Sequence, residues 1–311
     1  MKVMVVKNKV GSILVVVLLL MTCFLGIAAL VVDVGVAYAD KSHIAKALDS
    51  AAIAGAMELK LPDGRNKAIA KAIEYAAKND VEIDVSNITI SDSDSRITIS
   101  KDIQSNQFFG RVLGLTPFQV DGKSEAVIGP LGGYSGIRPF AIDSLDYTHG
   151  QQFSIKKASI EGYSGNFGYA DLDGHVGGGT PDLREWIKNG YPEMLYVGQY
   201  IYTETGNKTP AVNTVKAMLN TDETYLDYYD ESDRVWVVPY VESMEVDGAK
   251  QVMILGFAEI FVESVTGNGA NSRITARFLR PIDIIADGPV NTDPDAPDTG
   301  VNAVNLVKPT V

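Results

Sequence analysis

The chain has 311 residues, 46% of them hydrophobic, so it is long enough for one large domain or two ordinary ones with a buried core. Its formal net charge is −12, and because residues 1–33 carry three lysines and one aspartate, the remaining residues carry a net charge of −14. Such an acidic surface repels phosphate backbones, which excludes nucleic acid as an expected partner. The only cysteine, Cys23, lies in an apolar run, so we expect no disulfide and no thiolate metal site in the rest of the chain.

The first element in chain order is an apolar segment of membrane length. Residues 10–32 contain no charged side chain, and as a helix they span roughly 35 Å, more than the ~30 Å hydrocarbon layer of a bilayer. Three lysines precede this segment within residues 1–9, and Asp33 follows it. The positive-inside rule therefore predicts a cytoplasmic leader (1–9), a transmembrane helix (10–32) and an extracytoplasmic remainder.

An alternative interpretation is an export signal cleaved after Ala39, because Ala37-Tyr38-Ala39 fits the small-x-small pattern of a cleavage site. Two observations favour a retained helix. The apolar run is longer than the 7–15 residues typical of a signal sequence. No proline occurs before Pro62, so one helix of ~75 Å can continue to Leu59. We predict that residues 33–61 form a helical stalk.

The stalk carries a narrow apolar face with many small residues. Ile44, Leu48, Ala52, Gly55 and Leu59 recur at helical spacing. Alanines between them, which also favour helix formation, allow another element to approach the backbone closely.

Residues of this segment resemble the N-terminal region of TadG-like proteins of the Flp (Tad) pilus-assembly system. The resemblance is carried by a glycine that opens the apolar run, an Asp-x-Gly-x-x-Tyr exit and an Asp-x-Ala-Ala-x-Ala helix. It implies a set of membrane-exit and helix-packing residues: Gly11, Asp33, Gly35, Tyr38, Leu48, Asp49, Ala51, Ala52 and Ala54. Prepilins of this system carry glutamate five residues after the processed glycine, where this chain has Val16. The resemblance therefore implies an anchored assembly component rather than a processed pilin.

The rest of the chain is predicted to be α+β. Residues 62–129 combine a second helix with alternating apolar strands and form a small α+β domain packed on the stalk. A glycine-rich segment, residues 129–133, is the expected hinge to a strand-rich domain over residues 134–287. Residues 288–311 begin with a run of prolines and aspartates and are predicted to be a disordered tail.

No catalytic constellation is evident in the sequence. The three histidines are far apart, and no complete Gly-x-Ser-x-Gly motif occurs. Asp171, Asp173 and His175 are weak candidates for a metal site, but the further oxygen ligands of a calcium loop are missing. An ordinary Asp-Gly turn is the more economical interpretation, and no cofactor is expected.

The sequence thus predicts a single-pass protein that acts through protein–protein contacts in a Tad/Flp-type pilus or secretion system. Its expected partners are other pilus or secretion-system proteins and the lipid bilayer, with an oligomer through the stalk helix as a further possibility. The alternative is a surface adhesin whose residues 134–287 bind a ligand. An enzyme would need a clustered catalytic set.

Overall fold

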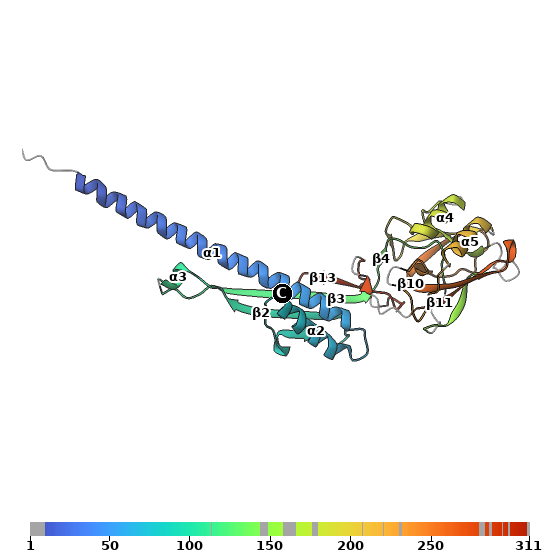
Figure 1. The fold of residues 1–311 in the computed structure, drawn as a ribbon, viewed down its shortest axis with the longest axis horizontal. Helices are drawn as coiled ribbons and strands as arrows, with labels where there is room; N and C mark the ends of the chain where they lie inside the picture. Colours follow the sequence, from blue (N-terminus) through green and yellow to red (C-terminus); the bar gives the residue numbers. More distant parts are fainter. Residues whose placement is uncertain are drawn as a thin grey trace, which may run out of the picture.

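The structure is a computed structural model. It describes residues 10–309 except 113, 144–148, 158–165, 176–179, 207, 220, 230–231, 280–283, 286–287, 294 and 298. The predicted leader, residues 1–9, lies outside the described residues. The molecule is elongated, with a single helix at one end and a strand-rich domain at the other (Figure 1). The predicted α+β class is confirmed.

The long helix α1 (Val10–Glu58) contains the apolar segment and residues 33–58 of the predicted stalk, whose last three residues form a turn. Forty-nine residues give it a length of about 74 Å. Among the described residues it is the one helix long and apolar enough to cross a membrane, and its most apolar window is not buried by protein. A turn at Asp63, whose φ is 60°, separates it from α2 (Gly64–Lys78).

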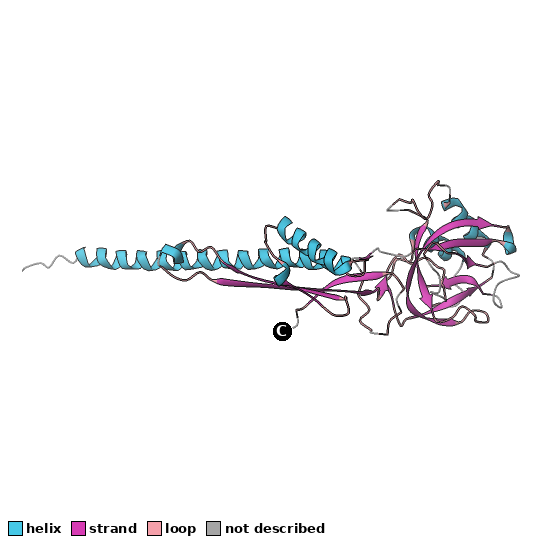
Figure 2. Ribbon diagram, turned by 90° about the horizontal axis from the view of Figure 1, so that it is seen from below, coloured by secondary structure: helices cyan, strands magenta, loops and turns pink. Residues whose placement is uncertain are grey.

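The C-terminal half of α1 packs with α2 against a five-stranded sheet, and these elements together form the first domain (Figure 2). A 3-10 turn, η1 (Val85–Asn87), precedes its first strand, and the short helix α3 (Phe109–Val112) connects β2 to β3. The strand order is β1 (Ile88–Ile90), β2 (Arg96–Gln104), β3 (Gln119–Pro130), β13 (Asn302–Val307) and β12 (Ile284–Ile285). All neighbours are antiparallel except β12 and β13.

The second domain is built on a six-stranded antiparallel sheet whose longest strand is β10 (Gln251–Thr266). Its other strands are β5 (Gln152–Lys156), β6 (Asn166–Asp171), β8 (Tyr200–Thr205), β9 (Val235–Val241) and β11 (Arg273–Phe278). A small ladder pairs β4 (Gly133–Tyr134) with β7 (Leu195–Tyr196), and the remaining elements are α4 (Thr180–Asn189), α5 (Thr209–Met218) and η2 (Gly269–Asn271).

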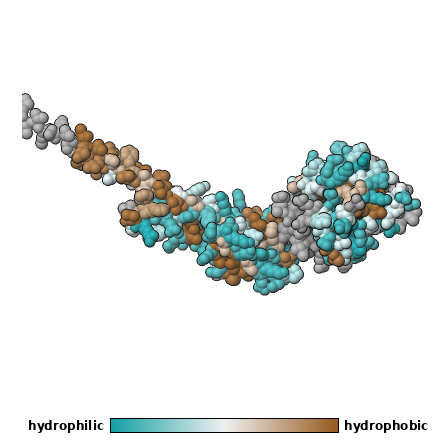
Figure 3. All heavy atoms as spheres, viewed as in Figure 1, coloured by the Kyte–Doolittle hydropathy of each residue, from teal (hydrophilic) through white to brown (hydrophobic). Residues whose placement is uncertain are grey.

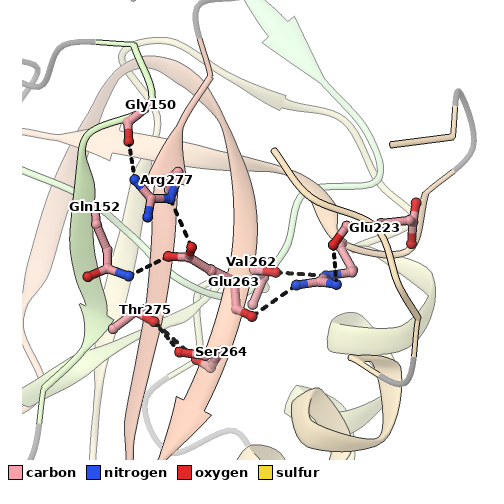
Figure 4. Close-up of polar contacts among 9 residues, drawn as sticks. Gly150, Gln152, Glu223, Val262, Glu263, Ser264, Thr275 and Arg277 are labelled. Atoms are coloured by element: carbon pink, nitrogen blue, oxygen red, sulfur yellow. Dashed lines mark hydrogen bonds and ion pairs between the residues drawn. The ribbon is translucent and has the colours of Figure 1, made fainter. Parts of the chain in front are cut away.

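Polar contacts join three neighbouring strands of this sheet (Figure 4). The Arg277 Nε donates to the Glu263 carboxylate at 2.9 Å, and the Gln152 amide donates to the same carboxylate. The hydroxyls of Ser264 and Thr275 lie 2.6 Å apart. These contacts tie β5, β10 and β11 together and are structural.

The prediction of a disordered tail over residues 288–311 is wrong. Residues 302–307 form β13, which pairs with residues 125–130 of β3. The proline and aspartate run ends at Asp298, and it is followed by apolar residues of which Val301, Ala303 and Val304 are buried. The strand-rich domain is therefore inserted between two adjacent strands of the first sheet.

The glycine-rich segment at residues 129–133 is not a free hinge. The Gly132 N–H donates to the carbonyl of Pro289 at 2.7 Å, and the Asn291 N–H donates to the carbonyl of Pro130 at 2.7 Å. A Cβ on Gly132 would lie 3.0 Å from the Pro289 carbonyl oxygen. The glycine therefore permits close backbone contact with the returning C-terminal segment, which restrains this connection.

The β3–β13 pair contributes side chains to two hydrophobic cores. Ile128 and Val304 belong to the core beneath α1, whereas Leu131 and Ala303 belong to the core of the second domain. Since the adjacent residues Ala303 and Val304 of β13 pack in different cores, as do Ile128 of β3 and Leu131 just beyond it, two paired strands and not a single linker join the domains.

Val304→Ala tests whether the C-terminal strand is part of the core. Val304 is 5% exposed, so the substitution should destabilise the first domain by about 2 kcal/mol. Thermal melting of the full-length protein in detergent measures this. The matched control is Leu306→Ala, at a position 43% exposed on the same strand, where we expect a loss under about 1 kcal/mol. Equal, negligible losses would contradict the placement of β13.

Candidate functional site

Asp33 holds the loop between β2 and β3, here called the α3 loop (residues 105–118). Its carboxylate accepts three backbone N–H groups: Phe108 at 2.8 Å and Phe109 at 3.1 Å on Oδ1, and Gly110 at 2.6 Å on Oδ2. These amides lie at the start of α3, where N–H groups have no partner within the helix. Although Asp33 follows the apolar segment, it is only 4% exposed, because the α3 loop covers it.

The pKa of Asp33 reflects two opposing effects. Burial raises its pKa, but the hydrogen bonds from Phe109, Gly110 and Phe108 stabilise the ionised form and outweigh burial, so the pKa is lowered from 3.8. The carboxylate is therefore charged at neutral pH. Hydrogen bonds to an ionised acceptor are stronger than those between neutral groups.

Two further carboxylates of α1 bind the same hairpin. Asp40 Oδ2 accepts the hydroxyl of Ser105 at 2.6 Å, and Asp49 Oδ1 accepts the hydroxyl of Ser124 at 2.6 Å. Asp40 is seven residues, or about two turns, from Asp33 and lies on the same side of the helix. The carboxylates therefore fix the position of the hairpin along α1.

The predicted packing residues lie between and beyond these carboxylates. Leu48, Ala51 and Ala52 are fully buried, and Ala54 is 8% exposed. What covers them is the protein's own α2 and sheet.

Two glycines let this packing face come close to its neighbours. A Cβ on Gly55 would lie 2.7 Å from Ile97 Cδ1 and 3.1 Å from the Ala68 carbonyl oxygen. A Cβ on Gly122 of β3 would lie 2.9 Å from the Ile44 side chain. Small residues at these positions therefore set the separation between α1, α2 and the sheet.

Other residues implied by the resemblance are not brought into this contact. A Cβ on Gly35 would have no neighbouring atom within 4 Å, and Tyr38 is 77% exposed. Gly11 lies in the first turn of α1, and its surroundings lie outside the described residues. The role of these three residues at the membrane exit stays a prediction.

The weak metal candidates form a local turn. The His175 N–H donates to Asp173 Oδ1 at 2.9 Å, and the His175 ring nitrogen Nδ1 lies 3.2 Å from the same oxygen. Burial raises the pKa of Asp173, but hydrogen bonding with Asp171 and with His175 lowers it by more, so the net shift of the pKa is downward. Within the described part of the chain, no group of three or more His, Cys, Asp or Glu side chains is arranged to hold a metal ion.

From the sequence we predicted Asp33 as a membrane boundary, which stays a prediction, but not as the acceptor for the α3 loop. Its partners lie 75 to 77 residues away, and no local pattern encodes such a pairing. The hydroxyl partners of Asp40 and Asp49 were missed for the same reason. Gly110 leaves room within the loop itself: a Cβ there would lie 2.5 Å from Gln107 Oε1 and 3.3 Å from Asp33 Oδ2, but a single glycine in the sequence does not indicate this.

A family model covers this helix. Residues 11–58 match the model described as putative Flp pilus-assembly TadE/G-like. Residues 11–58 are therefore similar to this family and are called the TadE/G-like region below. The match begins one residue inside α1 and ends at its last residue, so the TadE/G-like region and the long helix coincide. The resemblance inferred from the N-terminal residues is confirmed. No curated protein and no solved structure gives a significant match to the chain.

Asp33→Asn should release the α3 loop from the TadE/G-like region. Replacing one carboxylate oxygen by an NH₂ group puts a donor opposite backbone donors, so the amides of Phe108, Phe109 and Gly110 should exchange with solvent roughly tenfold faster or more. Hydrogen–deuterium exchange of the full-length protein in detergent measures this. Asp121→Asn is the control, because that side chain is 80% exposed; an equal effect in both variants would contradict the assignment.

The same carboxylate should give the protein a defined acid sensitivity. Because the folded-state pKa of Asp33 lies below 3.8, its stabilising contribution is complete above the unfolded-state value and is lost as pH falls through the folded-state value. The wild-type melting temperature should therefore fall more steeply below about pH 4 than that of Asp33→Asn. Parallel curves for the two proteins would contradict this.

Gly55→Ala and Gly35→Ala form a matched pair within α1. Gly55→Ala places a methyl group 2.7 Å from Ile97 and should destabilise the protein by about 1–2 kcal/mol. Gly35→Ala meets open space and should be neutral or stabilising by up to about 1 kcal/mol, because alanine is the better helix former. Melting temperatures in detergent compare them. Equal stabilisation by both would show that α1 does not approach its neighbours as described.

Proposed function

We propose that the protein is a single-pass component of a Tad/Flp-type pilus-assembly system that acts through protein–protein contacts. Its N-terminus lies in the cytoplasm and residues 33–311 lie outside it. The observation that carries the proposal is the coincidence of the TadE/G-like region with α1, a helix whose N-terminal half is apolar and uncovered by protein. The charge of the leader supports the orientation.

The contacts of Asp33 support retention of the anchor. Cleavage after Ala39 would remove Asp33 and leave three amides of the α3 loop without their acceptor. It would also cut within a continuous helix. We therefore propose that the mature protein keeps α1 intact; mass spectrometry of the mature N-terminus tests this, and a start at Asp40 would overturn it.

The packing face of α1 is covered by the protein itself, which limits where partner proteins can bind. Since Leu48, Ala51 and Ala52 are buried by the protein's own domain, an oligomer through this face would require the domain to detach. We therefore propose that partner proteins contact other surfaces, either the membrane segment or the second domain. The family is one of structural and assembly proteins, which supports a role without catalysis.

An adhesin is the second candidate function. The second domain lies at the end of the molecule away from the apolar half of α1, where a surface protein would present a binding domain (Figure 1). Binding of a host or matrix ligand by the intact protein, with normal pili in a deletion strain, would favour the adhesin over the assembly component.

The proposed assembly role predicts two results in cells. Cross-linking and blue-native electrophoresis of membranes should recover the protein with other pilus components, and deletion of its gene should abolish or reduce pili. Re-expression of wild type should restore them, whereas Asp33→Asn should restore them less well than Asp121→Asn. A protein that migrates alone, together with unchanged piliation after deletion, would contradict the proposal.

A further inference from the structure

Among the described residues of the α3 loop, five large apolar side chains between positions 108 and 118 are exposed. The exposed fractions are 68% for Phe108, 47% for Phe109, 83% for Val112, 60% for Leu115 and 40% for Phe118. Single exposed apolar residues are ordinary, but such a cluster marks an interaction surface. The cluster contributes nothing to the core beneath α1.

The contacts of the loop with α1 fix where this cluster lies. The loop begins at Ser105, bound to Asp40, and its tip at residues 108–110 is bound to Asp33. Seven residues of helix correspond to ~10 Å, so the loop extends that far toward the apolar half of α1. Asp33 directly follows residues 10–32, which carry no charge. The tip therefore lies level with the end of the predicted membrane span.

The space-filling view supports this continuity. Hydrophobic surface extends from the N-terminal half of α1 to the neighbourhood of α3, whereas the rest of the visible surface is mixed or hydrophilic (Figure 3). In Figure 1, α3 lies beside α1 at the end of the sheet nearest the helix N-terminus. The apolar cluster and the apolar span thus adjoin one another.

The side of the loop that faces α1 is distinct from the side that is exposed. Gln107 and Gly110 are buried, and a Cβ on Gly110 would lie 3.3 Å from the Asp33 carboxylate. The apolar side chains therefore project away from the helix. The one charged residue of the loop is Arg111, which is exposed. Aromatic and aliphatic side chains beside a cation are the composition of segments that lie in the membrane interface.

We propose that the α3 loop is a second membrane contact, resting in the lipid headgroup layer beside the point where α1 leaves the bilayer. Phe108, Phe109, Val112 and Leu115 contact lipid, and Arg111 binds lipid phosphate. The proposal rests on the proposed function, because it requires α1 to span the membrane. A bilayer is favoured over a protein partner because the cluster is continuous with the span and held at its depth.

Two contacts with the membrane, α1 and the α3 loop, restrict the orientation of the molecule more than α1 alone does. A single helix can tilt and rotate in a bilayer, and these motions are set by neighbouring contacts and interfacial anchors. The α3 loop lies to one side of α1, so its contact with lipid fixes both the tilt and the rotation of the helix. The stalk and the second domain then leave the membrane in one direction.

Fluorescence quenching in vesicles tests the proposal on the full-length protein. Cys23→Ser removes the native thiol, and Val112→Cys then provides a single site for an environment-sensitive fluorophore. The protein is reconstituted in phosphatidylcholine vesicles with phosphatidylglycerol, with or without spin-labelled lipid. We expect several-fold quenching by the spin-labelled lipid, a blue-shifted emission, and weaker quenching when Arg111→Gln is added or phosphatidylglycerol is omitted.

Two controls separate the ways in which the test can fail. A label at Val85→Cys, an apolar position 59% exposed in the same domain, should not be quenched by lipid. A label on native Cys23, within the span, reports whether α1 is in the bilayer. Quenching at Cys23 but not at residue 112 overturns the lipid contact and leaves the anchor; quenching at neither overturns the proposed function. If the label at residue 112 is shielded from an aqueous quencher and is also not quenched by spin-labelled lipid, another protein surface covers it. This result also overturns the proposal.

Discussion

The first domain depends on Asp33, the residue at which the surroundings of α1 change. On its N-terminal side the side chains of α1 are apolar and uncovered; on its C-terminal side one face is closed by α2 and a sheet. A carboxylate at this boundary would be costly if it were buried without partners. Three backbone amides from a hairpin satisfy it, so the end of the apolar half of α1 is also the point where the packed domain is attached.

This attachment determines the register of the first domain. Asp33, Asp40 and Asp49 bind the hairpin at successive positions, and the small residues between them allow the sheet to approach the helix backbone. Polar contacts give position, and apolar burial gives most of the stability. Gly55 and Gly122 show how little space remains in this interface.

Patterns of neighbouring residues in the sequence predicted the long helix and its packing face. The uncharged run, the lack of proline before Pro62 and the spacing of Ile44, Leu48 and Ala52 were enough to predict one long helix and its packing face. The partners of Asp33 could not be predicted, because they depend on a hairpin that returns to the helix from 75 residues away. The strand at residues 302–307 was missed because the adjacent prolines and aspartates dominated the composition of the C-terminal segment, although Val301 and Val304 pack in separate cores.

The insertion of the second domain between β3 and β13 has a mechanical consequence. A pull on that domain enters the first sheet along both β3 and β13, which are paired neighbours. Force along β3 loads its hydrogen bonds to β2 together, in shear, whereas β13 is pulled from the same end as β3. The resistance of such a joint is governed by the rate of unfolding rather than by equilibrium stability. The paired strands thus give the second domain a double connection to the sheet that packs on α1.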